Sequence, residues 1–447
     1  MAYTEQTVAF IRDLEWGNLP AEVQHQSKRC LLDTLGGLLA GYETPVTQIM
    51  AQIASSQFPG DQASIMVSGE RASVAGAVLV NGFAANALDI DDGYRRIMGH
   101  PGACILPVLL GAAQAVKGSG QAVTGTDFLT AMVVGYETGT RAGLIRHATY
   151  DTYHSSGSWG AICGAAAAGK LLGLSHDILW HALGTAEYHA PIAPMMKCID
   201  VPAMGKDSIG WGCVTAMLSV LMAREGFTGI RSIFDDAPDP AIMDSLGREW
   251  EIMNLYFKPY AACRWAQPAV DGALQLIREN GIALDEIDTI RVFTFEESAA
   301  LSRQYPENTE EAQYNIPFPI AAGILDKEVG PAQILPPRLF DTDIRNMMDK
   351  IEIIAQERFQ RLFPEKAESE VEIVTRSGNR FNSGMMSARW DIHTTLPTDS
   401  ELEEKFLWLA GPLLGDKKAV ELKDYIWQID RFKDLVQLYE LCQRSVE

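Results

Sequence analysis

Between about residues 4 and 226, apolar residues recur every three or four positions, in blocks separated by Gly, Pro or Ser. This spacing is typical of amphipathic helices and predicts them over 22–40, 70–89, 105–117, 127–145, 157–172 and 178–189. Thr126 and Ser175 precede two of these blocks and are predicted N-caps. Runs of Gly and Ala, as in 164–169, favour close contact between helices. We therefore expect a large all-helical domain.

The pattern changes after about Lys258. Residues 289–295 and 371–375 alternate polar and apolar side chains, as strands do, and 376–380 predicts a hairpin turn. Residues 268–280 and 341–350 predict helices between strands, and helical spacing returns over 400–442. The expected fold is mainly α. Its all-helical domain, residues 1–267, is completed by the C-terminal helices of 399–447, and residues 268–398 form a smaller α+β lid domain.

The charge balance limits the partners. The 447 residues include 37 Lys and Arg against 58 Asp and Glu, a formal net charge of −21. This excess repels phosphate backbones and anionic lipid surfaces, so we expect no nucleic acid and no membrane as partner. The apolar runs also fall short of the roughly 20 residues of a spanning helix. An anionic substrate would need locally clustered cations, because screening limits charge effects to about 8 Å.

The sequence lacks the motifs of several common enzyme classes and binding sites. The seven cysteines are scattered and never spaced as CxxC, which predicts neither disulfides nor a zinc site. Reduced thiols and an N-terminus without the features of a secretory signal favour a cytoplasmic protein. The sequence has no Rossmann glycine fingerprint, P-loop, GxSxG or HExxH. We therefore expect no cofactor and no metal.

The densest polar cluster lies between two predicted helices and comprises Asp89, Asp91, Asp92, Arg95, Arg96 and His100. A solvated charge run is the simplest interpretation, but the Gly and Pro residues around His100 indicate a shaped loop. A magnesium site like that of isoprenoid synthases is the alternative. Those enzymes resemble one another in a DDxxD pattern, and Arg95 occupies the third acidic position here. Asp89 and His100 are therefore acid–base candidates.

Three further segments carry candidate chemistry. His154 precedes the predicted helix of 157–172, where the helix dipole favours a bound carboxylate and a neutral imidazole, although such a histidine is often structural. Lys206 lies among small and apolar residues and needs an anionic partner, either Asp207 or a ligand. Lys258 and Arg264 lie at the boundary between the domains, where clefts tend to form. These cations suit a carboxylated substrate.

At these four places the sequence resembles the MmgE/PrpD family, which includes 2-methylcitrate dehydratase, cis-aconitate decarboxylase and iminodisuccinate epimerase. The resemblance runs over almost the whole chain. The matching motifs, in order, are Leu-Leu-Asp-Thr-Leu-Gly-Gly at 31–37, Asp-Ile-Asp-Asp at 89–92 with His-Pro at 100–101, the loop and helix of 154–174, Lys-Pro-Tyr at 258–260 with Cys-Arg at 263–264, and Glu-Ala-Gln-Tyr-Asn-Ile-Pro at 311–317. The last looks like the family's strand-to-helix segment.

The resemblance implies a helical domain with a smaller lid, a homodimer, and an active site in the cleft between them. Carried over by residue, the catalytic groups are Asp89, His100, His154 and Lys206, with Lys197 as an alternative for the lysine. The predicted substrate-binding residues are Lys258, Arg264, Arg95 and Tyr314. Two departures touch presumed substrate contacts: Gly93 replaces the Thr usual in dehydratases and decarboxylases, and Gln267 replaces a frequent His.

The expected function is a cofactor-independent lyase, a dehydratase or decarboxylase, acting on a small polycarboxylic acid. His154 or Asp89 would remove a proton next to a carboxylate, and His100 would protonate the leaving group or the carbanion. Lys206, Lys258 and Arg264 would stabilise the enediolate. The alternatives are an epimerase of a compound such as iminodisuccinate, which Gly93 favours, and an inactive helical binding protein.

Overall fold

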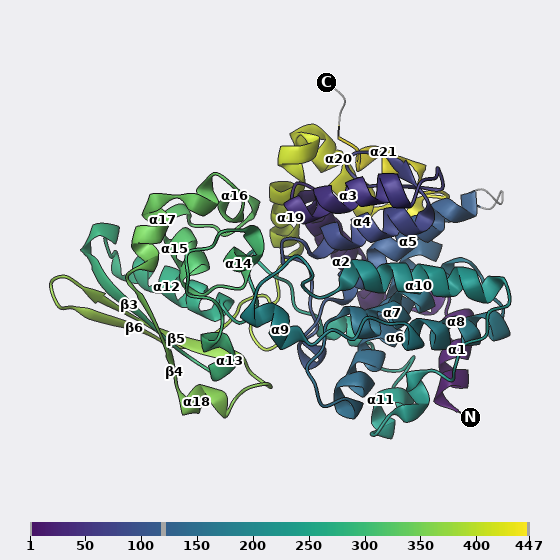
Figure 1. Cartoon of the computed structure of the whole chain (residues 1–447), viewed down its shortest axis with the longest axis horizontal. Coiled ribbons are helices and arrows are strands. Elements are labelled where there is room, and N and C mark those ends of the chain that lie inside the picture. The colour runs from purple at the N-terminus through teal and green to yellow at the C-terminus, as the bar shows by residue number, and fades with distance from the viewer. Residues whose placement is uncertain (1, 118–121, 445–447) are drawn as a thin grey trace.

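The computed structural model describes residues 2–117 and 122–444, which form two lobes of unequal size (Figure 1). The larger, here called the helical lobe, contains α1 (Tyr3–Asp13), α2 (Ala21–Gly41), α3 (Pro45–Gln57), α4 (Val74–Asn86), α5 (Pro101–Lys117), α6 (Gly125–Thr149), α7 (Gly157–Leu171), α8 (His176–Tyr188), α9 (Met195–Asp200), α10 (Ile209–Arg224), α11 (Pro240–Asp244) and a short hairpin of β1 (Ala63–Ser64) and β2 (Arg71–Ala72). No helix among the described residues is both long and apolar enough to cross a membrane.

The helices that the sequence predicts are present, with differences at their ends: α5 begins at Pro101 and α6 ends at Thr149, each four residues beyond the prediction. The helix expected over 70–89 is shorter, because Ser73 caps its start by accepting a hydrogen bond from the backbone N–H of Gly76, and the helix ends at Asn86. The N-cap of α6 is Thr124 rather than Thr126, since Thr124 and Asp127 form a reciprocal capping box. The prediction of Thr126 as the cap was wrong.

Helix α7 is the buried centre of the helical lobe and packs against α5, α6, α8 and α10. Its small residues make this possible, as the Gly and Ala pattern predicts. A Cβ at Gly160 would lie 2.3 Å from Cys104 Sγ on α5, and one at Gly164 would lie 2.8 Å from Ala216 on α10. Larger side chains would force these helices apart.

The C-terminal helices complete the helical lobe, as predicted. They are α19 (Asp399–Leu414), α20 (Asp416–Trp427) and α21 (Val436–Leu441), and α19 and α20 pack on α2 (Figure 1, yellow against purple). A buried ion pair joins the two segments, with Lys405 Nζ 2.5 Å from Asp33 Oδ1. The same ammonium donates to the carbonyl of Ile90, 2.7 Å away. The tail therefore also fixes the loop that follows α4.

The smaller lobe, here called the α+β lobe, has a four-stranded sheet in the order β4–β3–β5–β6. The strands are β3 (Ile287–Thr294), β4 (Ile351–Ala355), β5 (Glu368–Thr375) and β6 (Arg380–Ser387), with β3 and β4 parallel and the other pairs antiparallel. Helix α12 (Gln267–Asn280) packs on β5 and β6 and is followed outward by α15 (Pro317–Asp326) and α17 (Thr342–Met348). Short helices complete the lobe: α13 (Glu296–Ala299), α14 (Thr309–Gln313), α16 (Pro331–Ile334) and α18 (Glu357–Gln360).

The mainly α fold with a smaller α+β region is confirmed, and so is the predicted hairpin between β5 and β6. The segment 311–317 differs from expectation. It joins two helices, α14 and α15, rather than a strand and a helix. Asn308 caps α14 through its side chain, which favours a helical turn at the position where a strand was expected. The exact domain boundaries stay predictions.

Candidate active site

A polar cavity lies where the two lobes meet. The helical lobe contributes the loop after α4, the segments that lead into α7 and α10, and the helix α9. The connection between the lobes and the turn after α14 contribute the rest. The residues that line the cavity are Asp89, Arg95, Met98, His100, Tyr153, Met195, Ile199, Asp207, Tyr256, Lys258, Cys263, Arg264, Trp265 and Tyr314. Of the eight predicted site residues, six line this cavity.

Strained backbone surrounds the cavity. Asp89, Met98, Lys206 and Ser208 all have left-handed conformations, with φ of 52°, 43°, 38° and 53°. For residues with a side chain this conformation costs roughly 1 kcal/mol or more, and it clusters at functional sites. The loops on both sides of the cavity are therefore shaped by their tertiary contacts and not by local preference.

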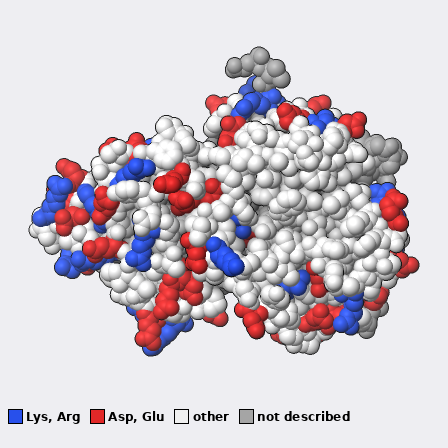
Figure 2. Space-filling model, viewed as in Figure 1, with Lys and Arg blue, Asp and Glu red and all other residues white. Residues whose placement is uncertain are grey.

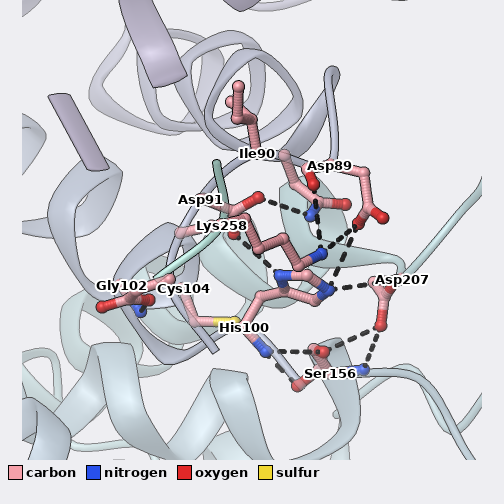
Figure 3. A network of polar contacts seen from close by, with 12 residues as sticks. Asp89, Ile90, Asp91, His100, Gly102, Cys104, Ser156, Asp207 and Lys258 are labelled. Carbon is pink, nitrogen blue, oxygen red and sulfur yellow. Dashed lines mark hydrogen bonds and ion pairs between the residues drawn. The ribbon is translucent and has the colours of Figure 1, made fainter. Parts of the chain in front are cut away.

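His100 is held among carboxylates (Figure 3). Its Nδ1 lies 3.0 Å from Asp91 Oδ2, and its Nε2 lies 3.4 Å from Asp89 Oδ1 and 4.0 Å from Asp207 Oδ2. Burial and the positive charge of Lys258 would lower the pKa of His100. The negative charges of Asp91 and Asp207 outweigh them, so this pKa lies above its ordinary value. Burial likewise opposes ionisation of Asp91, yet His100 lowers the pKa of that carboxyl to about 2. The arrangement favours an imidazolium, which can donate a proton.

Lys258 is the cation that neutralises Asp89. Its Nζ lies 3.1 Å from Asp89 Oδ1 and donates to the Asp89 carbonyl over the same distance. Burial would lower the pKa of Lys258, but Asp89 raises it above its ordinary value. Burial would raise the pKa of Asp89, but Lys258, Lys206 and His100 hold it below the ordinary value. Asp89 is thus a carboxylate fixed between cations.

Lys206 lies behind Asp89 and does not line the cavity. Its ammonium donates to the carbonyl of Asn86 at 2.5 Å and to Oε1 of Gln313 at 2.6 Å, and Asp89 Oδ1 is 4.0 Å away. Within the described chain it forms no ion pair with Asp207, the neighbour that the sequence suggested as partner. Lys197, the alternative lysine, is exposed on α9.

Asp207 and Ser156 connect the two halves of the site. Ser156 Oγ donates to Asp207 Oδ1 at 2.8 Å and accepts from the backbone N–H of His100 at 3.2 Å (Figure 3). The Tyr314 hydroxyl approaches Asp207 Oδ2 at 3.5 Å. Tyr314 was predicted as a site residue, whereas Asp207, Ser156 and Asp91 were not. Only their position beside predicted residues in the sequence could have indicated them.

Arg264 forms the wall of the cavity facing the α+β lobe. Its guanidinium pairs with Asp391 at 3.1 Å and lies 4.4 Å from the centre of the Tyr256 ring. Gln267, one of the two departures from the family pattern, is buried and accepts a hydrogen bond from Arg264 at 3.2 Å, so it positions this arginine. Arg95 is half-buried and its Nε donates to the carbonyl of Glu365 at 3.0 Å, but no carboxylate of residues 2–117 or 122–444 pairs with it. The cationic wall can therefore bind an anion.

His154 lies away from these groups. It is buried but is not among the residues that line the cavity. Its Nδ1 is 2.6 Å from Ser158 Oγ, and its ring stacks on His147 with centroids 4.4 Å apart. Burial lowers the pKa of His154, and the charge of Arg146 acts in the same direction. A neutral imidazole agrees with the expectation, but the structure does not bring it to His100, and its catalytic role stays a prediction.

Asp89, Asp91 and His100 also meet the geometry of a cation site, since one ligand atom from each lies within 4.8 Å of the others. Their charges favour a different partner. Lys258 and Lys206 place two ammonium groups beside Asp89, which neutralise the carboxylates and would repel a divalent ion. Metal independence nevertheless stays a prediction.

Known proteins match the chain over nearly its whole length. A cis-aconitate decarboxylase-like protein of Aspergillus oryzae, oryM, is 24% identical, with 98% of this chain and 96% of the relative covered. The cis-aconitate decarboxylase of Homo sapiens is 26% identical, with 98% and 94% covered. That of Aspergillus terreus is 21% identical, with 99% and 96% covered.

Two domain families describe the same span. Residues 5–246 match the MmgE/PrpD N-terminal domain, which covers the helices α1 to α11. Residues 260–430 match the MmgE/PrpD C-terminal domain, which covers the α+β lobe and the helices α19 and α20. The order and extent of these matches agree with the resemblance found in the motifs, and the chain therefore belongs to the MmgE/PrpD family.

Proposed function

We propose that the protein is a cofactor-independent lyase that decarboxylates a small, unsaturated polycarboxylic acid. The observation that carries this proposal is the position of His100 among three carboxylates at the cavity wall, beside the buried ammonium of Lys258. The full-length relatives named as cis-aconitate decarboxylases support the choice of decarboxylation among the reactions of the family. The substrate class follows from the cationic wall of Arg95 and Arg264.

Decarboxylation fits the chemistry of these groups. As the carbon–carbon bond to the departing carboxylate breaks, its electron pair moves through the carbon–carbon double bond of the substrate toward a second carboxylate and forms an extended enediolate. Lys258 stabilises that negative charge, and fixed charges inside a buried site act strongly because little water screens them. His100 then transfers its proton to the carbon that lost carbon dioxide. This reaction needs an acid but no separate base.

The alternatives have less support from the site. Dehydration and epimerisation both require a base that removes a proton from carbon. Asp89 is a weak base, because its cationic neighbours lower its pKa, and His154 is not at the cavity. Gly93 is the one feature of the sequence that favours the epimerase, and none of the relatives named above adds support for it. A binding protein without activity would not need His100 and Lys258 buried together at a cavity wall.

The proposal is tested by incubating the purified protein with cis-aconitate, citrate and 2-methylcitrate in deuterated water. We expect release of carbon dioxide from an unsaturated tricarboxylate, with one deuterium incorporated in the product. The activity should survive exhaustive EDTA treatment and dialysis. Loss of water without carbon dioxide would identify a dehydratase instead, and activity restored only by magnesium or manganese would establish the metal site at Asp89, Asp91 and His100.

The pH dependence should report the charge on His100. If the imidazolium is the acid, kcat/KM falls as pH rises through the pKa of His100, which lies above its ordinary value. Asp91→Asn removes the carboxylate that raises this pKa most, so the alkaline limb should move to lower pH. Asp177→Asn, at an exposed carboxylate beside His176, should leave the profile unchanged. A limb that stays in place in Asp91→Asn would contradict the assignment of the acid.

A homodimer is also proposed. Figure 2 shows a broad area without charged side chains over the helical lobe, and helices α3 and α10, which both pack on α4, expose Ile49, Ile53, Trp211 and Leu218. Exposed apolar patches of this kind favour association. Light scattering should give twice the chain mass. The double variant Trp211→Glu, Leu218→Glu should be monomeric, whereas Met385→Glu on the α+β lobe should remain dimeric.

A further inference from the structure

The Tyr256 ring fills the space above Gly93. The two residues form an antiparallel bridge, in which the N–H of Gly93 donates to the Tyr256 carbonyl at 3.0 Å and the N–H of Tyr256 donates to the Gly93 carbonyl at 2.9 Å. A Cβ on residue 93 would lie 2.2 Å from the ring carbon Cζ and 2.3 Å from the hydroxyl oxygen of Tyr256. Any side chain at position 93 would therefore displace the phenol.

The Tyr256 hydroxyl differs from those of the other cavity tyrosines. Tyr153 donates to the carbonyl of Met98 at 3.1 Å, and Tyr314 approaches Asp207. Tyr256 is 5% exposed and lines the cavity, and its hydroxyl forms no hydrogen bond with any described residue. A buried phenol without a protein partner needs an acceptor from elsewhere.

The surroundings of this hydroxyl indicate the charge of that acceptor. Arg264 stacks on the Tyr256 ring, and Arg95 and Lys258 line the same cavity. Burial raises the pKa of Tyr256 above its ordinary value, although these three cations oppose the rise, so the group is a neutral donor at physiological pH. A carboxylate of the substrate would accept from the phenol and be neutralised by the arginines.

We propose that Tyr256 is a substrate-binding and specificity-determining residue, whose hydroxyl donates to the central carboxylate of a tricarboxylate substrate, and that Gly93 lacks a side chain to make room for it. This inference rests on the proposed function, because it assumes a polycarboxylate in the cavity. It adds one contact between the protein and the substrate of that function. The phenol occupies the position where a side chain on residue 93 would otherwise reach the substrate.

The experiment compares Tyr256→Phe with the wild-type enzyme in two assays. Calorimetry measures the binding of tricarballylate, a saturated tricarboxylate, and of glutarate, which lacks its central carboxylate. Kinetics measures kcat and KM with the substrate identified above. We expect Tyr256→Phe to weaken tricarballylate binding by about 10- to 100-fold, the usual effect of losing a hydrogen bond to a charged group. KM should rise with little change in kcat, because the contact persists throughout the reaction.

Selectivity gives a second readout that general damage to the fold would not produce. The preference of the wild type for tricarballylate over glutarate should narrow in Tyr256→Phe. The control is Tyr425→Phe, which removes a hydroxyl that donates to the carbonyl of Asp434 in the C-terminal helices, far from the cavity. It should bind both acids as the wild type does, and thermal melting should report both variants as folded.

Gly93→Ala tests the steric half of the proposal. Because its Cβ must displace the phenol, we expect Gly93→Ala alone to weaken tricarballylate binding at least as much as Tyr256→Phe. In the double variant the loss should equal that of Gly93→Ala, since the hydroxyl is already displaced. Losses that multiply would overturn the coupling of Gly93 to Tyr256.

Failure of the Tyr256 proposal and failure of the proposed function would give different results. Wild-type binding and turnover, together with an unaffected Tyr256→Phe, would refute the role of Tyr256 and leave the proposed function standing. A wild-type protein that neither binds tricarballylate nor converts any of the acids would refute the proposed function, and the role of Tyr256 would fall with it.

Discussion

His100→Asn is expected to lower kcat/KM by about 10²- to 10⁴-fold, the range over which a positioned acid contributes to catalysis. The His100 imidazole lies 3.0 Å from Asp91 and 3.4 Å from Asp89, and these carboxylates favour the charged form that the proposed mechanism uses as the acid. The asparagine amide can still donate to Asp91 and so preserve the loop, but it has no proton to transfer at neutral pH. The loss should therefore appear in kcat more than in KM.

The matched control is His25→Asn. His25 is half-exposed, pairs with Asp399 at 2.9 Å and stacks on Trp427, so it belongs to the packing of the C-terminal helices. This control should retain normal turnover. Steady-state kinetics with circular dichroism of both variants separates catalysis from folding. Turnover of a folded His100→Asn within a factor of a few of the wild type would refute the acid assignment.

Lys258→Met is expected to lower kcat by about 10²- to 10³-fold, as does the loss of one group that stabilises a transition-state anion. It should also destabilise the fold by about 3 kcal/mol, because breaking a buried ion pair leaves the other charge unpaired. Among the described residues, Asp89 would keep His100 at 3.4 Å and Lys206 at 4.0 Å as its counterions. Kinetics and urea denaturation measure the two effects on the same samples.

A second substitution separates the two roles of Lys258. Adding Asp89→Asn to Lys258→Met removes the unpaired charge, so much of the lost stability should return while activity should not. Lys28→Met, which breaks the 2.6 Å pair with Asp430 at the C-terminal helices, is the structural control and should affect stability only. If the double variant regained turnover along with stability, Lys258 would have a structural role alone.

The elements of the fold were predictable because their signals are local. The spacing of apolar residues predicts α2 and α6 to within a few residues, and the alternation over 289–295 predicts β3. The errors arose where a few side chains determine where a helix begins. Ser73 caps α4, which therefore begins later than its apolar pattern predicts. Thr124 caps α6 in place of Thr126, and Asn308 favours a helical turn in α14. Such contacts depend on single hydrogen bonds rather than on periodicity.

The site was predictable only as a set of segments. Asp89 and His100 were singled out by a dense polar cluster, and Lys258 and Arg264 by their position at the domain boundary. All four line one cavity. Lys206 was also singled out, but it supports Asp89 from behind. No local signal distinguishes a lysine that faces a cavity from one that faces the backbone, because each lies in a loop whose conformation is set by distant contacts.

The sequence by itself determined the helical and strand segments, the excess of acidic charge and the four polar motifs, since these follow from short-range spacing and residue type. Only the tertiary structure decided which groups meet. It pairs Gly93 with Tyr256, surrounds His100 with three carboxylates and leaves His154 beside His147. These outcomes depend on left-handed backbone at Asp89 and Lys206 and on the tail that holds Ile90 through Lys405. Contacts between residues far apart in the chain stabilise such conformations, and a local pattern does not encode them.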